Sequence, residues 1–290
     1  MKNPCIACVV FNTAENPLVL RNLNRFLRQL AAEGLPFYVA EVALGDHAWV
    51  LQAAPNVIQL RAAADQALWY QWNLVNILEK HIPAEFDAIA WIDADVWFQR
   101  LDWYEAACEA LEDYAVVQLA DTMVWTGEDG RAEFSIPSAA SLGKLVLGEG
   151  HPGFAWAARR SLWSEGGGLY ERAIIGGGDT VNCAAWLPRD DDLGWLGYSD
   201  AAAAIAPLRQ WARQNGGCGC VAGTLWHEWH GSFASRQYTE RHRWLTGLDV
   251  TTHLQNRPDG LLEWSPDAPE AVKEAIRAYF QARQAAARHR

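Results

Sequence analysis

Residues 86–98, FDAIAWIDADVWF, join an apolar run to two closely spaced acids. The run AIAWI is typical of a buried strand, and Asp93 and Asp95 follow it directly. We expect a single strand over the whole segment. Side chains two residues apart in a strand point to the same side, so both carboxylates should project together from one edge of a sheet.

Strand-like and helix-like patterns alternate on both sides of this segment. Alternation at this spacing is typical of βαβ units and of a mostly parallel sheet. The predicted fold class is therefore α/β, with a Rossmann-like, mostly parallel sheet flanked by helices. The strand-like segments are 5–11, 37–44, 56–60 and 114–120, and the helix-like segments are 17–32, 65–80 and 103–113.

The second half of the chain has a different pattern. Residues 121–152 contain Gly, Ser and Glu with few periodic apolar positions, which indicates a mobile loop region or one that faces a substrate. Residues 153–163 have the pattern of a strand that turns into a helix, and 174–187 that of a glycine-rich turn that opens a helix. Residues 266–290 are expected to form a C-terminal helix.

Composition and charge narrow the class of protein. The chain has 290 residues, half of them hydrophobic, which is enough for one large domain or for two fused halves. Its net charge of −11 disfavours general affinity for nucleic acid and for anionic membranes. No apolar run approaches the roughly 20 residues of a membrane-spanning helix, so we expect a cytoplasmic protein without a membrane span.

The acid pair suggests a metal site. Carboxylate oxygens are hard ligands that suit Mg²⁺ or Mn²⁺. Open α/β sheets bind ligands at the carboxyl ends of their strands, which is where Asp93 and Asp95 are expected. An ion held there could bridge the two phosphates of a nucleotide diphosphate and neutralise charge on a leaving group. The alternative is an acidic turn that only ends a strand.

The segment Gly176–Asp179, GGGD, is the second candidate. Gly177 and Gly178 permit positive φ angles and a close approach of ligand to backbone. Asp179 is expected at a helix N-terminus, where it could serve as the N-cap. It could equally accept a proton from an attacking hydroxyl, since the helix dipole favours its charged form. Both roles remain open.

The segment LWHEWHG, residues 225–231, is the third. Its histidines are three residues apart, so the HExxH zinc motif is absent. We expect His227 or His230 to supply a nitrogen ligand to the ion held by Asp95, because imidazole accepts Mn²⁺. The alternative for either histidine is a purely structural hydrogen bond.

Together these segments resemble the GT-A glycosyltransferases of bacteria and phages, which are related to family 2 and to galactosyltransferase-like glycosyltransferases. Each segment alone is weakly specific, but the set follows the family's order across nearly the whole chain. The resembling segments are 68–76, 90–98, 116–121, 153–163, 173–184, 225–231, 236–241 and 259–264.

The resemblance implies a GT-A fold in which 1–120 bind a nucleotide sugar, 121–265 form a continuous acceptor and catalytic half, and 266–290 are the C-terminal helix. It implies a metal-dependent hexosyltransferase that uses Mn²⁺ or Mg²⁺, takes a nucleotide-diphosphate-sugar donor, foremost a UDP-sugar, and modifies a glycan or another hydroxyl acceptor. Asp179 would be the base of an inverting reaction.

Individual positions follow from the same resemblance. Asp93 and Asp95 would form the D-x-D motif, with Asp95 the more direct ligand, and His230 or His227 the C-terminal metal ligand. Gly177 and Gly178 would border the donor. The further positions implied in donor or acceptor binding are Phe11, Asn12, Glu41, Asp46, Trp156, Arg236 and Arg241.

Two departures from the family pattern leave alternatives open. Gln71 and Trp72 stand where a Lys–Glu pair is expected, and GGGD stands where many relatives have GGED. One alternative is a catalytically degenerate protein that only binds a sugar nucleotide or a glycan. A second is a transferase that acts on modified phage or bacterial DNA, which the acidic net charge disfavours. A third alternative is a sugar-nucleotide pyrophosphorylase. Such enzymes need a basic, glycine-rich loop after the first strand, and this sequence has no such loop there.

Overall fold

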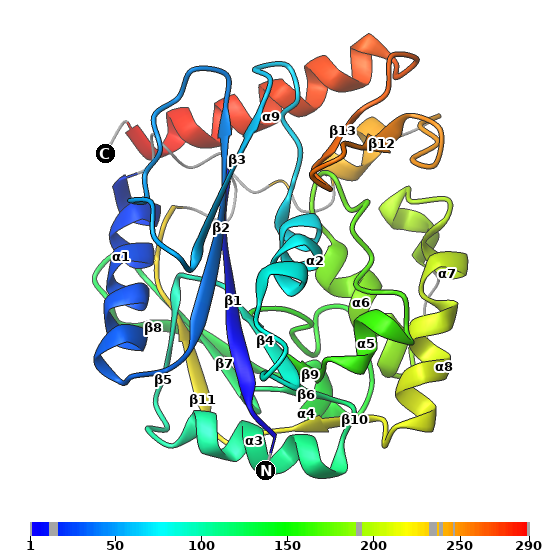
Figure 1. Ribbon diagram of the computed structural model, residues 1–290. Coiled ribbons are helices and arrows are strands. Elements are labelled where there is room, and N and C mark those ends of the chain that lie inside the picture. The colour runs from blue at the N-terminus through cyan, green and yellow to red at the C-terminus, as the bar shows by residue number, and fades with distance from the viewer. Residues whose placement is uncertain are drawn as a thin grey trace.

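The computed structural model describes residues 2–11, 17–189, 193–231, 237, 240–245 and 247–288, with side chains up to residue 283. Its larger sheet has seven strands in the order β10-β6-β9-β4-β1-β2-β3. A second sheet has the order β5-β11-β7-β8, and β12 pairs with β13. The predicted α/β class is confirmed, and Figure 1 shows α1 on one side of the large sheet and α2 and α6 on the other.

The strands and helices have the following bounds. The strands are β1 (Pro4–Phe11), β2 (Phe37–Leu44), β3 (Val57–Ala62), β4 (Ala88–Ile92), β5 (Val96–Phe98), β6 (Val116–Gln118), β7 (Thr122–Thr126), β8 (Ala132–Pro137), β9 (Ala155–Arg159), β10 (Cys218–Cys220), β11 (Thr224–His227), β12 (Leu254–Asn256) and β13 (Leu262–Trp264). The helices are α1 (Pro17–Ala32), α2 (Gln71–His81), α3 (Trp103–Asp113), α4 (Ala139–Leu142), α5 (Ser161–Ser164), α6 (Gly178–Trp186), α7 (Ala201–Ala204), α8 (Ala206–Gln214) and α9 (Glu270–Arg288), with 3-10 turns η1 (Leu193–Leu196) and η3 (Glu240–Leu245).

The large sheet is mostly parallel. Strand β1 pairs in parallel with β2 and β4, and β2 with β3, whereas β9 is antiparallel to both β4 and β6. Strands β9 and β10 come from the second half of the chain, so one sheet spans the predicted division at residue 120. The carboxyl ends of β1, β2 and β4 therefore meet at one edge, where an α/β sheet binds ligands.

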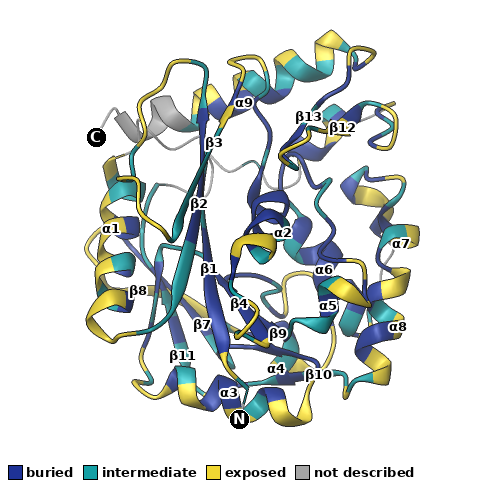
Figure 2. Ribbon diagram, viewed as in Figure 1, coloured by how far each residue is buried: buried dark blue, intermediate teal, exposed yellow. Residues whose placement is uncertain are grey.

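Two apolar cores lie on the two faces of this sheet. Successive residues of β1 alternate between them: Cys5 and Ala7 belong to one core, and Ile6 and Cys8 to the other. Figure 2 shows these central strands buried over most of their length. Within the described residues, no helix combines the length and the apolar character needed to cross a membrane.

The segment 86–98 is not the single strand that its apolar pattern predicts. Strand β4 ends at Ile92, the backbone turns through Asp93–Asp95, and β5 joins the four-stranded sheet. The turn is held where the backbone N–H of Asp93 donates to the carbonyl of Phe154 at 2.8 Å. The two carboxylates therefore lie in a turn. The prediction that they project to the same side of one continuous strand is wrong.

Residues 121–152 are also more regular than predicted. They contain β7, β8 and α4, and β7 pairs with β8 in an antiparallel hairpin. Most residues of β8 are exposed, which explains why this strand lacks a continuous apolar pattern in the sequence.

Gly178 is required by packing. A methyl group at this position would lie 1.9 Å from Nε1 of the buried Trp72. Gly178→Ala is therefore expected to lower the free energy of unfolding by about 1–3 kcal/mol or more, as overpacking does. Gly127→Ala is the control, because its methyl group would meet only the flexible side chains of Glu133 and Asp129. Urea denaturation should show a clear loss for the first variant and little change for the second.

Candidate metal centre

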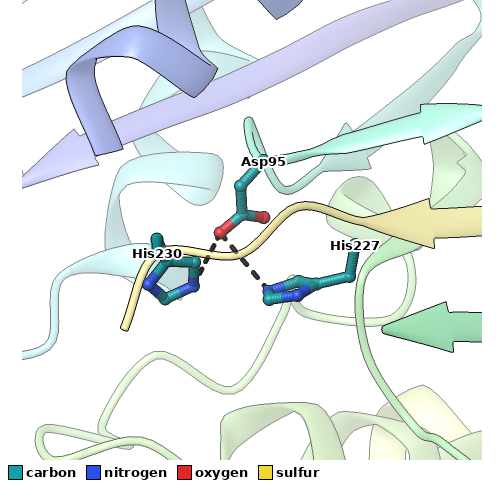
Figure 3. A group of neighbouring side chains, drawn as sticks. All are labelled: Asp95, His227 and His230. Carbon is teal, nitrogen blue, oxygen red and sulfur yellow. Dashed lines mark ion pairs between the residues drawn. The ribbon is translucent and has the colours of Figure 1, made fainter. Parts of the chain in front are cut away.

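Three potential metal ligands converge beside the turn that follows β4. They are Asp95, His227 and His230, and their ligand atoms all lie within 4.8 Å of one another (Figure 3). Pairing between β5 and β11 brings them together, because it places His227 opposite Val96. The next backbone N–H, that of Glu228, donates to the carbonyl of Asp95 at 2.7 Å. The structure thus unites residues that are more than a hundred positions apart.

The side chains in this cluster face one another. Oδ2 of Asp95 lies 3.0 Å from Nε2 of His230 and 3.5 Å from Nε2 of His227. Burial raises the pKa of Asp95, but the charges and hydrogen bonds of His227 and His230 outweigh it and hold this pKa well below its usual range. Asp95 is therefore ionised, as a metal ligand must be.

The donor set fits a divalent ion. Oδ1 of Asp95 is buried, and no hydrogen-bond donor reaches it among the residues that the structure describes. A buried carboxylate oxygen in this state is costly unless a cation or another partner satisfies it. One carboxylate and two imidazoles suit Mn²⁺ or Zn²⁺ better than Mg²⁺, which prefers oxygen ligands.

Neighbouring side chains hold the segment that carries the two histidines in place. Oγ1 of Thr126 donates to the carbonyl of His227 at 3.1 Å and accepts from the N–H of Trp229 at 3.0 Å. Glu228 forms an ion pair with Arg25 of α1. These contacts fix the exit of β11 between two other elements, so the imidazoles are positioned by the fold.

Asp93 makes a different contact from Asp95. Its Oδ1 accepts a hydrogen bond from Nε2 of Gln71 at 2.8 Å, and Oε1 of Gln71 accepts one from Nε1 of Trp69 at 2.9 Å. Asp93 is not in the metal-ligand cluster formed by the described residues. Gln71, which departs from the family pattern, thus anchors the acid that was expected to share the ion.

Asp179 is the second residue of α6. The N-cap is Gly177, which has φ 82°, so the N-cap role expected for Asp179 is wrong. Burial raises the pKa of Asp179 to about 6, although the positive charge of Arg241 and a backbone hydrogen bond act in the opposite direction. A carboxylate whose pKa lies near neutrality is suited to proton transfer.

Arg241 supplies the positive charge near Asp179. It lies in η3, is 4% exposed, and donates from Nη1 to Oη of Tyr279 at 2.8 Å. Its guanidinium lies 5.5 Å from the ring centroid of Trp69, and that of Arg283 lies 5.2 Å from the same centroid. The end of α9 and η3 therefore place two cations around one indole.

The glycines at the start of α6, Gly177 and Gly178, serve a different purpose from the predicted one. A methyl group at Gly177 would meet Leu196 at 2.7 Å and His242 at 3.0 Å, and Gly178 is covered by Trp72. Protein side chains therefore occupy the space that was expected to admit a ligand. The role of Gly177 and Gly178 is to let α6 begin against these neighbours.

The positions on and after β2 that were expected to contact the donor differ in burial. Glu41 is in the middle of β2, 2% exposed, and its carboxylate accepts from the N–H groups of Val50 at 2.6 Å and Leu51 at 3.1 Å. It therefore holds a loop and is not free to bind a ribose. Asp46 lies exposed in the turn after β2.

Phe11 ends β1 and packs edge-on against Trp69, with ring centroids 5.4 Å apart. Trp156 is 2% exposed and packs against Trp186 in the core, so the expected contact with a sugar is wrong. Asn12 and Arg236 lie outside the described residues.

Two residues near the cluster carry no obvious sequence signal. Phe154 is stacked on His227, with ring centroids 4.8 Å apart, and has φ 77°, which is rare for a bulky residue. His151 stacks on Phe154, with centroids 4.0 Å apart. The sequence HPGF shows a turn, but neither the ring stack nor the positive φ can be seen in it.

The chain matches no protein-family model and no curated protein. It is similar to residues 1–349 of Staphylococcus aureus TarS, with a TM-score of 0.45 and 15% identity over 98% of this chain and 71% of that chain. Mannosyl-3-phosphoglycerate synthase from Rubrobacter xylanophilus gives a TM-score of 0.41 and 14% identity over 90% and 84% of the two chains.

The catalytic domain of Drosophila beta1,4galactosyltransferase 7, in complex with xylobiose, gives a TM-score of 0.35 and 12% identity over 66% of each chain. Sugar-transferring enzymes are thus among the solved structures that this chain resembles.

Proposed function

We propose that this protein is a metal-dependent glycosyltransferase of the GT-A type, which moves a hexose from a nucleotide-diphosphate-sugar to an acceptor hydroxyl. The observation that carries the proposal is the cluster of Asp95, His227 and His230 next to the carboxyl end of β4. This is the edge at which open α/β sheets bind their ligands.

The roles of the residues follow from their chemistry. Asp95, His227 and His230 would hold the ion, which when bound neutralises charge on the departing diphosphate. Arg241 adds positive charge near Asp179. Asp93, anchored by Gln71, keeps the turn after β4 in place.

Asp179 is the candidate base. It would take the proton of the acceptor hydroxyl as that oxygen bonds to the anomeric carbon and the bond from this carbon to the diphosphate oxygen breaks. Direct attack of this kind inverts the anomeric configuration. The raised pKa of Asp179 supports the assignment, because a base is most effective when its pKa lies near the working pH.

The proposed reaction needs a sugar donor and a hydroxyl acceptor. A UDP-sugar is the proposed donor, and a glycan or another hydroxyl compound is the proposed acceptor. A DNA acceptor is disfavoured by the net charge of −11. A degenerate binder would keep donor affinity and lose turnover, so binding and transfer must be measured separately.

A thermal-unfolding screen tests donor binding. The protein is heated with UDP, GDP or CMP, or with their sugars, each in Mn²⁺, Mg²⁺, Zn²⁺ or EDTA. One nucleotide is expected to raise the unfolding temperature only with a divalent ion, since a ligand at 100 times its Kd adds about 2.7 kcal/mol of stability. If no nucleotide stabilises the protein with any ion, the proposed donor site is wrong. Binding without transfer to any hydroxyl acceptor would support the degenerate binder.

A further inference from the structure

The turn before β9 contacts both halves of the candidate site. It consists of residues 151–154, HPGF, and β9 begins directly after Phe154. The phenyl ring of Phe154 lies between two imidazoles, with its centroid 4.0 Å from that of His151 and 4.8 Å from that of His227. Both pairs are stacked with 24° between the ring planes. Phe154 therefore packs against one face of the imidazole ring of His227, a candidate metal ligand.

The preceding residue contacts the candidate base. A methyl group at Gly153 would lie 2.9 Å from Cγ and 3.0 Å from Oδ1 of Asp179. The carboxyl group therefore rests directly against the Cα of Gly153. Any side chain here would push Asp179 away from its place at the start of α6.

The turn is both strained and tightly held. A left-handed backbone costs a residue with a side chain about 1–2 kcal/mol, and Phe154 has φ 77°. The buried Gln118 donates from Nε2 to the carbonyls of His151 at 2.9 Å and Gly153 at 3.1 Å. The carbonyl of Phe154 accepts from the N–H of Asp93 at 2.8 Å. Strain that its surroundings hold in this way is typical of functional sites.

We propose that Gly153 and Phe154 form a positioning element that sets the place of Asp179 relative to the metal-binding cluster. Phe154 orients His227, and Gly153 provides the surface on which the carboxyl group of Asp179 rests. The effect of this positioning element on turnover rests on the proposed function. Its effects on ion binding and on packing do not. Neither residue contacts the reacting atoms in this assignment.

Two variants separate the two contacts. Phe154→Leu keeps apolar volume but removes the ring, so it should weaken Mn²⁺ binding by about 10- to 100-fold, as loss of a residue that supports a metal ligand does. Gly153→Ala should leave Mn²⁺ affinity within about threefold and lower kcat by about 10- to 100-fold, because a misplacement of about 1 Å costs this much. Calorimetry with Mn²⁺ alone measures the first effect without any donor or turnover.

Phe134→Leu is the matched control. Phe134 belongs to the same group of rings through Trp125, with centroids 4.6 Å apart, but it is 41% exposed and lies on β8. It should change neither Mn²⁺ affinity nor kcat. Phe154→Tyr keeps a ring and should retain the affinity that Phe154→Leu loses.

A double-mutant cycle tests the packing even if Gly153→Ala folds poorly. In an Asp179→Ala background the added methyl group no longer meets the carboxyl group but still meets Cε1 of His151 at 3.1 Å, so the loss in unfolding temperature should become smaller without disappearing. Equal losses in both backgrounds would overturn the contact with Asp179. Unchanged Mn²⁺ affinity in Phe154→Leu would overturn the contact with His227. Failure of the transferase proposal itself would appear as absent turnover in the wild-type protein.

Discussion

Asp95→Ala is expected to lower Mn²⁺ affinity by at least about 100-fold, since even a residue that only supports a metal ligand contributes about 10- to 100-fold. Asp95 is the one acid in the described cluster, and both histidines point at its Oδ2. Without it, only the two imidazoles remain, and no carboxylate in the described cluster balances the ion's charge. Metal-dependent stabilisation by the nucleotide should disappear with the ion.

Asp102→Ala is the matched control for this experiment. It also removes one carboxylate near β5, but Asp102 is exposed and pairs with Arg100 at the surface. Calorimetry with Mn²⁺ should find wild-type affinity in this variant. If Asp95→Ala binds Mn²⁺ as tightly as Asp102→Ala does, the ion lies elsewhere and the proposed centre is wrong. Unfolding curves in EDTA show whether each variant is folded.

Local patterns predict the elements of the fold well. The apolar spacing after Pro17 predicts a helix over 17–32, and α1 has these bounds. The run 37–44 is found as β2. Each of these segments buries a face that its own sequence periodicity reveals, so no distant contact is needed to recognise it.

The turn after β4 shows where local patterns fail. The run 86–98 has a continuous apolar pattern, but Val96 pairs with His227, a partner 131 positions away. No local signal reports that β5 leaves the large sheet. Residue type alone suggests that Asp95 shares an ion with His227 or His230. The geometry of the cluster could not be predicted, because it depends on this long-range pairing.

Glu41 and Trp156 illustrate the opposite error. The resemblance implies that both lie near the donor or the acceptor. The structure gives Glu41 two backbone N–H groups and buries Trp156 against Trp186. Sequence shows that a residue type suits a role, but it does not show whether the protein itself already occupies that side chain.

Asp179→Asn is expected to lower kcat by about 100- to 10,000-fold, the range that general acid–base catalysis contributes. Its effect on donor affinity should be small, because Asn keeps the shape of the side chain and the metal ligands are untouched. In the wild-type protein kcat should rise as the pH increases through about 6, the pKa to which burial raises Asp179. This limb of the pH profile should be absent in the variant's residual activity.

The same substitution should make the protein more stable above pH 6. Because the folded-state pKa of Asp179 is raised, folding favours the protonated form, and the fold loses stability as the pH rises from the acid's ordinary range through about 6. Asn carries no charge to bury, so Asp179→Asn should unfold at a higher temperature than wild type at pH 8 and at a similar one near pH 4.

Asp113→Asn, at the exposed end of α3, is the control for these measurements and should change neither kcat nor the pH dependence of unfolding. Gained stability together with lost turnover is typical of a residue whose burial serves catalysis. A structural acid would instead lose stability when replaced and leave turnover within a few-fold. Thermal unfolding at two pH values therefore shows whether Asp179 is a stabilising structural acid even before the acceptor is identified, and turnover then shows whether it is the base.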